Sequence, residues 1–362
     1  MKWSRKRVLV TGGAGFIGSN MCDQLLGLGA DVVVVDKLQV SSATLPWNRK
    51  LVRLEQVFRK HGVSKMPIEI CDLETEKKSF QILCSKADAV FHLSAVFGGR
   101  EFVDTRQADC SKMLAIDHNA IEAAYEAGVE RFHYASSACV YPDSLQKSRR
   151  YLLKEDDALS TGEGWKSADN LYGFAKLMGE MQGVVFHSEK GLKTSTCRYL
   201  TVYGPGELDT SHAISALIER ALDRSDPFEV WGSGNQERGF TYVTDIVKGS
   251  IRATEAIEDG TPVNLGWDKR YRIGEVARLV TKLSGYRPRM VFNLSKPEGP
   301  FSRALDIRRA RSMLGWVPEV DLEEGLEKTI EWHRAQRAAV QVETRKERLR
   351  TGGSSPTSRR SR

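Results

Sequence analysis

The sequence lacks the features of membrane, disulfide-rich and zinc-binding proteins. No apolar run approaches the ~20 residues that a membrane-spanning helix needs. The six cysteines are scattered, with no C-x-x-C pair and no metal-site spacing, which indicates reduced thiols. The N-terminal MKWSRKR leads into a glycine-interrupted apolar segment, unlike a signal peptide. We therefore expect a cytoplasmic protein without disulfides or a metal site.

No internal repeat is visible in the 362 residues, and this length exceeds that of a usual single domain. The formal net charge is +7, but residues 335–362 hold eight Lys or Arg against two Glu. The rest of the chain is therefore close to neutral. We predict a disordered, solubilising basic tail over 334–362, because its polar end cannot bury enough apolar surface to fold. Contact of this tail with nucleic acid or a partner is the alternative.

The chain is organised around an N-terminal glycine-rich segment, VLVTGGAGFIG at 8–18. The β-branched start at Val8–Val10 predicts a buried parallel strand. Gly12 would permit a tight turn, Gly15 a close approach to a pyrophosphate, and Gly18 close packing of the next helix on the strand. The free N–H groups of that helix would face the phosphates.

A second apolar run, Val32–Val35, ends in Asp36, which lies 18 positions beyond Gly18. An acid at a spacing of ~20 binds a ribose 2′-hydroxyl, so the pattern favours NAD over NADP. A βαβ unit without a cofactor is the alternative.

Three further buried strands are predicted, at 67–73, 89–95 and 131–135, with helices between them. Ligands bind at the carboxyl ends of such strands. Asp72 ends the first strand, Gly98 and Gly99 follow the second, and the third leads into Ser137 and Cys139.

The next helix carries Tyr172 and Lys176, which are four residues apart and therefore on one face. A phenol of pKa near 10 is a poor base at neutral pH, and an adjacent cation would lower its pKa. Lys176 could also hold the nicotinamide ribose. The alternative for this pair is an amphipathic helix with a snorkelling lysine, and for Cys139 a small buried core residue.

Later segments predict further elements: helices at 214–222, 243–253, 273–283 and 310–316, a strand at 261–266 and a final helix from Leu322 to about Arg334. The segment 228–235, FEVWGSGN, predicts a β-hairpin whose aromatic residues line a base pocket.

Several of these motifs together resemble the extended short-chain dehydrogenases/reductases that act on nucleotide sugars. They are TGGAGFIG, HLSA at 92–95, SSACVYP at 136–142, the Tyr172/Lys176 pair and RYLTVYGP at 198–205. The resemblance spans about residues 6–333 and is strongest to the GDP-mannose 3,5-epimerases, with features of the GDP-fucose synthases. It implies an α/β Rossmann fold with a doubly wound parallel sheet, a smaller α/β substrate-binding domain, and a homodimer formed through two helices per subunit.

On this resemblance, residues 1–198 and 238–262 form the NAD-binding domain, and 199–237 with 263–333 form the nucleotide-sugar-binding domain. The implied cofactor-binding residues are Gly12, Gly15, Phe16, Ile17, Gly18, Asp36, Asp72, Leu73, Leu93, Ala95, Tyr172 and Lys176. The implied substrate-binding residues are Gly98, Gly99, Ser137, Thr201, Trp231, Arg238 and Arg303.

The resemblance also implies roles in catalysis. Ser137, Tyr172 and Lys176 match the hydride-transfer triad, in which the Tyr takes a proton from the sugar C4 hydroxyl. Cys139 matches the base that inverts C3 or C5 through a 4-keto intermediate, and a cationic neighbour such as protonated His212 would favour its thiolate. His212 matches the histidine segment of the GDP-fucose synthases and is the candidate acid.

Each of the last assignments has an alternative. His212 could belong to a helix-capping region, and Arg303 could pair with Glu298 or Asp306. The chain departs from the pattern at Thr201, where an asparagine is usual, and it lacks the lysine loop of the 3,5-epimerases. Asp36 differs from the GDP-fucose synthases, which use NADPH.

We therefore predict an NAD-dependent nucleotide-sugar epimerase, with a GDP-mannose-type substrate favoured and no nucleic acid or membrane as partner. One alternative is a C4-epimerase that uses the Ser/Tyr/Lys triad alone. The other is a non-catalytic NAD-sensing or nucleic-acid-binding protein of the same fold.

Overall fold

The computed structural model describes residues 1–38, 47–159 and 168–350. Its centre is a seven-stranded sheet in the order β11-β6-β5-β4-β1-β2-β3, with every neighbouring pair parallel. The strand order reverses between β1 and β4, which makes this a doubly wound sheet and confirms the predicted α/β Rossmann fold. The strands are β1 (Arg7–Thr11), β2 (Asp31–Asp36), β3 (Ile68–Ile70), β4 (Ala89–His92), β5 (Arg131–Ser137), β6 (Lys193–Tyr199) and β11 (Asp259–Leu265).

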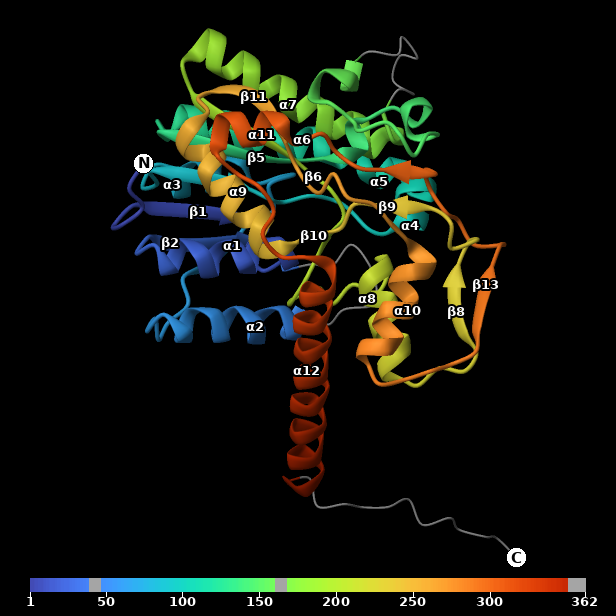
Figure 1. Ribbon diagram of the computed structural model, residues 1–362. Helices are drawn as coiled ribbons and strands as arrows, with labels where there is room; N and C mark the ends of the chain where they lie inside the picture. Colours follow the sequence, from blue (N-terminus) through green and yellow to red (C-terminus); the bar gives the residue numbers. More distant parts are fainter. Residues whose placement is uncertain (39–46, 160–167, 351–362) are drawn as a thin grey trace, which may run out of the picture.

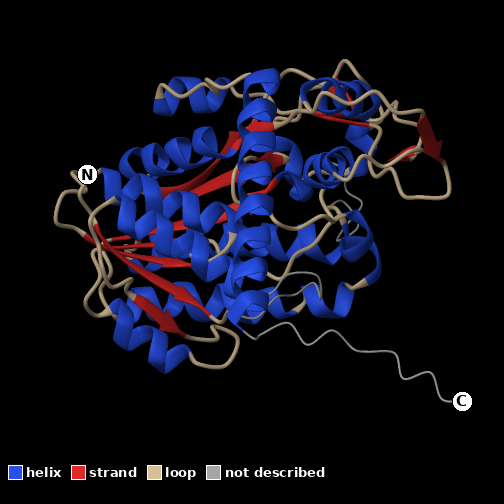
Figure 2. Cartoon of the chain, turned by 90° about the horizontal axis from the view of Figure 1, so that it is seen from below, coloured by secondary structure: helices blue, strands red, loops and turns tan. Residues whose placement is uncertain are grey.

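Helices cover both faces of the sheet, as Figure 2 shows from below. One face carries α1 (Phe16–Gly27), α2 (Trp47–Lys60) and α9 (Val243–Ala256), and the other carries α3 (Lys77–Cys84), α6 (Lys112–Glu126) and α7 (Asn170–Lys190). Strand residues alternate between the two faces of the sheet: Val10 and Val34 pack toward α1, whereas Leu9 and Val35 pack toward α3 and α6. Because both faces are buried, the central strands β1, β2 and β4 are mostly apolar, as the sequence predicted.

A second core lies beside the carboxyl edge of the sheet (Figure 1). It is formed by α8 (Ala213–Leu222), β8 (Phe228–Trp231), α10 (Ile273–Leu283), β13 (Met290–Asn293) and α12 (Leu322–Arg350). The predicted hairpin at 228–235 is wrong, because β8 pairs in parallel with β13, about 60 residues later in the chain. The glycines after Trp231 turn the chain away from β8 and do not return it antiparallel.

Shorter elements connect the two cores. β14 pairs with β9, which sets Arg303 opposite Arg238, and β10 pairs with β7. These elements are α4 (Arg100–Thr105), α5 (Gln107–Cys110), α11 (Arg308–Leu314), β7 (Val202–Tyr203), β9 (Glu237–Arg238), β10 (Thr241–Tyr242), β12 (Tyr271–Arg272), β14 (Ser302–Arg303) and three 3₁₀ turns at Ala138–Val140, Asp143–Gln146 and Glu155–Leu159. No helix in the described ranges is long and apolar enough to cross a membrane.

Helix α12 corrects the prediction of a disordered tail from residue 334. The helix continues to Arg350, and its far end extends beyond the body of the chain (Figure 1). His333 Nδ1 lies 2.7 Å from Glu219 Oε1, and Arg337 Nη1 lies 2.7 Å from Asp223 Oδ1, both on or next to α8. The apolar residues with which α12 packs into the second core are Leu322, Leu326 and Ile330. The contacts of His333 and Arg337, together with a run of Ala, Gln, Glu and Arg that favours helix, extend α12 beyond them. The prediction for 351–362 lies outside the described residues.

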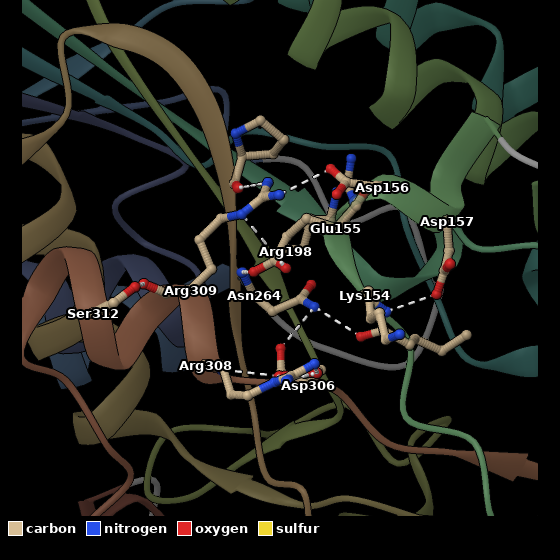
Figure 3. A network of polar contacts seen from close by, with 12 residues as sticks. Lys154, Glu155, Asp156, Asp157, Arg198, Asn264, Asp306, Arg308, Arg309 and Ser312 are labelled. Carbon is tan, nitrogen blue, oxygen red and sulfur yellow. Dashed lines mark hydrogen bonds and ion pairs between the residues drawn. The ribbon is translucent and has the colours of Figure 1, made fainter.

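A buried ion pair holds α7 against the sheet. Arg198 of β6 is 2% exposed, and its Nε and Nη2 donate to the two carboxylate oxygens of Glu180 in α7 at 2.8 and 2.6 Å. Its Nη1 donates to the Tyr141 hydroxyl at 3.0 Å and to the Glu155 carbonyl at 2.6 Å. Figure 3 shows Arg198 beside Glu155 and Asn264, whose backbone N–H donates to Glu155 Oε1 at 3.0 Å.

We expect Arg198→Ala to lower the free energy of unfolding by about 3–5 kcal/mol, because it leaves the Glu180 carboxylate buried without its partner. Urea denaturation followed by circular dichroism measures the change. The matched control is Arg59→Ala, whose exposed pair with Glu55 spans 3.5 Å on α2 and contributes less than about 1 kcal/mol. Equal losses in the two variants would contradict this account of α7.

Candidate functional site

One cavity of about 550 Å³ lies at the carboxyl edge of the sheet, between the two cores. Every residue that the sequence proposed for catalysis, cofactor binding or substrate binding lines this cavity. Parallel strands end on the same edge, and the loops after β1, β2, β4, β5 and β6 therefore meet there.

The glycine-rich turn forms the cofactor end of the cavity. Gly12 has φ +64°, and a Cβ at Gly18 would lie 2.2 Å from the Gly12 carbonyl oxygen, so neither position accommodates a side chain. Helix α1 begins at Phe16 and has no side-chain N-cap within the described residues. Its first-turn N–H groups are therefore available to an anion.

Asp36 forms the next part of this end of the cavity. It is 8% exposed, and its two oxygens accept the backbone N–H groups of Ala14 at 3.1 Å and Leu38 at 2.8 Å. A buried carboxylate accepts hydroxyl donors and repels a phosphate. The turn, the helix start and Asp36 together fit NAD, because they offer a hydroxyl acceptor and free N–H donors of the kind that its ribose and pyrophosphate require.

The Ser/Tyr/Lys group lies where β5 ends and α7 begins. Ser137 Oγ accepts the Cys139 backbone N–H at 3.2 Å and is hydrogen-bonded to Tyr172. Burial raises the pKa of the Tyr172 hydroxyl, and the Ser137 hydrogen bond opposes this shift. In the protein alone the pKa of Tyr172 is therefore not lowered, although Lys176 lies four residues away on the same helix, because desolvation dominates.

Cys139 is in contact with a cation, but the cation is an arginine. Arg303 Nη1 lies 3.4 Å from the Cys139 sulfur, and its Nη2 lies 3.1 Å from Asp169 Oδ2. Burial and the charge of Asp169 raise the pKa of the Cys139 thiol, while Arg303 opposes the rise. Cys139 is thus a thiol in the resting protein, and Arg303 is positioned to stabilise its thiolate.

Asp169 is a site residue that the sequence analysis missed. It is 3% exposed, directly precedes α7, and accepts from Arg100 Nη1 at 2.7 Å as well as from Arg303. Its own N–H donates to the Cys139 carbonyl at 2.7 Å. Burial would raise the pKa of this carboxyl, but Arg303 and Arg100 hold it below its ordinary value. No local pattern marks Asp169, because its partners lie far away in the chain. The alternative pairing of Arg303 with Glu298 or Asp306 is wrong.

Arg238 is one of the cavity arginines suited to an anionic ligand. Its guanidinium donates only to backbone carbonyls, at 2.6 Å to Pro300 and 2.9 Å to Glu298, and forms no ion pair with the described part of the chain. Burial, followed by the nearby positive charges of Arg303 and Arg100, lowers its pKa to about 9. A half-buried cation without a carboxylate partner favours a bound phosphate.

His212 is paired with a carboxylate that the sequence analysis also missed. Its Nδ1 contacts Glu207 Oε1, and its ring stacks on Phe97 with centroids 6.0 Å apart. Burial alone would lower the pKa of His212, but Glu207 raises it to about 9. The Gly98 carbonyl is a further acceptor for the ring. His212 is therefore an imidazolium at neutral pH.

Two other predicted positions shape the substrate end. Thr201 has φ +36°, a backbone conformation that an asparagine adopts more readily than a β-branched residue. Two cations lie near the Trp231 ring: Lys296 Nζ is 4.8 Å and the Arg220 guanidinium 6.0 Å from its centroid. This flat ring with flanking donors is suited to a nucleobase.

Comparison with known proteins places this geometry in a family. Residues 8–266 match the NAD dependent epimerase/dehydratase family. The chain is 30% identical over 335 residues to GDP-mannose 3,5-epimerase 1 of Oryza sativa subsp. indica, covering 91% of this chain and 82% of that relative. It is 30% identical over 328 residues to UDP-glucuronate 4-epimerase of Thermodesulfobacterium geofontis, covering 90% and 95%.

A solved structure agrees with these relatives. UDP-glucuronic acid 4-epimerase from Bacillus cereus, in complex with UDP-glucuronic acid and NAD, has a TM-score of 0.76 at 26% identity over 91% of this chain and 99% of that one. The family match covers most of the chain and includes the glycine-rich turn, Asp36 and the Ser/Tyr/Lys group. This chain therefore belongs to the NAD-dependent epimerase/dehydratase family, and its cofactor is NAD.

Proposed function

We propose that this enzyme is a nucleotide-sugar epimerase that inverts C3, C5 or both through a 4-keto intermediate, with a GDP-mannose-type substrate. The observation that carries the proposal is that Cys139 and His212 line the same cavity as Ser137, Tyr172 and Lys176. A triad that oxidises C4 is thereby combined with a thiol and an imidazolium, which are the groups needed for proton exchange at a neighbouring carbon.

The chain's own groups divide the work. Tyr172, as phenolate, accepts the C4 hydroxyl proton, and Ser137 donates a hydrogen bond to the same oxygen. When bound, NAD supplies the acceptor and later the donor of the C4 hydride, and its positive charge favours anionic groups that line the cavity. The C4 ketone acidifies the hydrogens at C3 and C5, because the carbanion delocalises as an enolate.

Inversion then needs a base and an acid on opposite faces of the sugar. Cys139, as a thiolate stabilised by Arg303, removes the proton. His212, held as an imidazolium by Glu207, returns a proton to the other face. Arg238 binds the diphosphate and Trp231 stacks on the base. Lys176 holds hydroxyl groups of the nicotinamide ribose.

A second candidate is a C4-epimerase, in which the triad suffices and Cys139 is a packing residue. The raised pKa of Cys139 and the similarity to a 4-epimerase favour it. The hypothesis of a non-catalytic NAD sensor is not retained, because the family is one of enzymes.

We expect the protein with NAD and GDP-mannose in D₂O to introduce deuterium at C3 or C5, since an enolate exchanges its proton with solvent. Proton NMR measures the incorporation, and UDP-glucuronic acid and other nucleotide sugars follow if GDP-mannose is inert. Cys139→Ala should lower exchange at least about 100-fold, the usual contribution of a general base, and leave NAD binding intact. The control is Cys110→Ala, a buried thiol outside the cavity lining. Epimerisation without deuterium would establish the C4 mechanism instead.

The pH dependence of exchange tests His212. The imidazolium loses its proton as pH rises through about 9. Exchange should fall over that range, provided that the loaded site already holds Cys139 as its thiolate. In Glu207→Gln the burial of His212 is no longer opposed by a carboxylate, and both its NMR titration and the alkaline fall should move to lower pH. Asp209→Asn removes a carboxylate that raises the pKa of His212 less than Glu207 does, so it should shift the alkaline fall by a smaller amount. An alkaline fall unchanged in Glu207→Gln would exclude His212 as the acid.

We also propose that the chain forms a homodimer through α6 and α7, in a cytoplasmic, reducing compartment. The outer faces of these neighbouring helices expose Leu114, Tyr125, Met181 and Val184 at 37–47%. An apolar patch of this kind on two adjacent helices is typical of an interface. All six cysteines are free thiols, which supports the compartment.

The double variant Met181→Glu, Val184→Glu should shift the protein from dimer to monomer, because it places charges in the apolar patch. Size-exclusion chromatography with light scattering measures the mass. Leu294→Glu, at an exposed apolar position on another surface, is the control and should leave the mass unchanged. A wild-type monomer at micromolar concentration would refute the dimer.

A further inference from the structure

A chain of buried polar groups runs under the cavity from the glycine-rich turn to α7, and none of its members has a role in the mechanism above. Thr11 Oγ1 lies 2.8 Å from His92 Nδ1, and His92 Nε2 lies 3.0 Å from Asp117 Oδ1. The Tyr134 hydroxyl donates to Asp117 Oδ2 at 2.6 Å. All four residues are at most 3% exposed.

The hydrogen bonds of this buried polar network are mutually consistent. Thr11 Oγ1 accepts the N–H groups of Leu93 at 3.2 Å and Ser94 at 3.3 Å, so its one proton is available to His92 Nδ1. His92 then carries its proton on Nε2 and donates to Asp117. The Asp117 carboxylate accepts from both His92 and Tyr134. A network in which every member is satisfied is rigid, so it fixes the Tyr134 ring in place.

The Tyr134 ring lies directly beneath the Lys176 ammonium. Lys176 Nζ is 4.7 Å from the ring centroid, a cation–π distance. Helix α7 approaches the ring closely, since a Cβ at Gly179 would lie 2.2 Å from the Tyr134 hydroxyl oxygen. The Lys176 ammonium makes no hydrogen bond or ion pair with residues 1–38, 47–159 and 168–350. Lys176 lines the cavity. Its N–H donors are therefore available to a ligand.

Asp117 provides the negative charge for this buried cation. Burial lowers the pKa of Lys176, and the charges of Asp117 and Glu180 oppose that shift. Glu180 already accepts from two of the three guanidinium nitrogens of Arg198. Asp117 has no arginine or lysine within ion-pair distance in the described chain. Its negative charge therefore stabilises the Lys176 ammonium, which lies over the Tyr134 ring. Donation by the Tyr134 hydroxyl to a carboxylate also enriches the ring in electron density and strengthens its attraction for a cation.

We propose that Tyr134, held by Asp117, is a positioning residue that aims the Lys176 ammonium at the hydroxyl groups of the nicotinamide ribose. The inference rests on the proposed role of Lys176 in cofactor binding. It does not depend on which sugar is the substrate, or on whether C3, C4 or C5 is inverted.

The test compares the affinities of NAD and ADP, by isothermal titration calorimetry on protein freed of bound nucleotide. ADP contains the adenosine and diphosphate but no nicotinamide ribose. Tyr134→Leu should raise the Kd for NAD roughly 10- to 30-fold, the range for a desolvated cation–π contact, and leave the Kd for ADP within about twofold. Tyr134→Phe keeps the aromatic ring and nearly the same side-chain volume, so the packing of the core is preserved. It should raise the NAD Kd about threefold through loss of the Asp117 hydrogen bond.

The matched control is Tyr151→Leu. Tyr151 lies outside the cavity at a partly buried position and makes the same two kinds of contact, with Asp157 Oδ1 2.9 Å from its hydroxyl and Lys154 Nζ 5.8 Å from its ring. This variant should bind NAD normally. In a Lys176→Met background, Tyr134→Leu should cause no further loss, because the two residues act as one unit.

Each other outcome overturns the inference. Equal losses for NAD and ADP would show a merely structural role for Tyr134, and additive losses in the double variant would show that it acts independently of Lys176. If Lys176→Met weakens NAD binding but both Tyr134 variants bind NAD normally, only the inference fails. If Lys176→Met itself binds NAD normally, the proposed role of Lys176 fails as well.

Discussion

The close packing of α7 on β5 and β6 is the constraint on which the site depends. The Arg198–Glu180 ion pair holds the helix against the sheet, and Gly179 lets it pass directly over Tyr134. Tyr172 and Lys176 are therefore presented at the carboxyl edge of β5, beside Ser137. A buried bidentate pair supplies geometry more than net stability, since desolvation offsets much of its attraction. Its value here is that it fixes the orientation of a helix that carries two reactive side chains.

The charges around the cavity form two separate units, one around Cys139 and one around His212. Arg303 and Asp169 surround Cys139, whose thiol keeps its proton because burial outweighs the arginine. Glu207 contacts the His212 ring and raises its pKa despite the opposing effect of burial, so the imidazole stays protonated. Both groups are acids in the resting protein. The proposed base is thus activated only when ligands change the charge and solvation of the cavity, which restricts proton abstraction to the loaded site.

Much of the fold and of the candidate site was predictable from local patterns. The glycine-rich turn, Asp36 and the apolar strands have short-range signatures, because turn geometry and two-sided burial act on neighbouring residues. The partners Asp169, Glu207 and Asp117 had no such signature, since each matters through a residue that is near only in the folded chain. The same reason explains the errors at 228–235 and in α12. Strand β8 takes its partner about 60 residues away, and the helix is extended by side chains of α8.

The sequence by itself determined the alternating strands and helices of the parallel sheet, the cofactor turn and the types of reactive side chain, because periodicity and glycine spacing are local properties of the backbone. Only the tertiary structure decided which cation contacts Cys139, that His212 is held as an imidazolium, and that Tyr172 has a raised rather than a lowered pKa. These properties depend on burial and on charges brought together from distant segments. Desolvation is a property of the packed protein and has no counterpart in the order of residues.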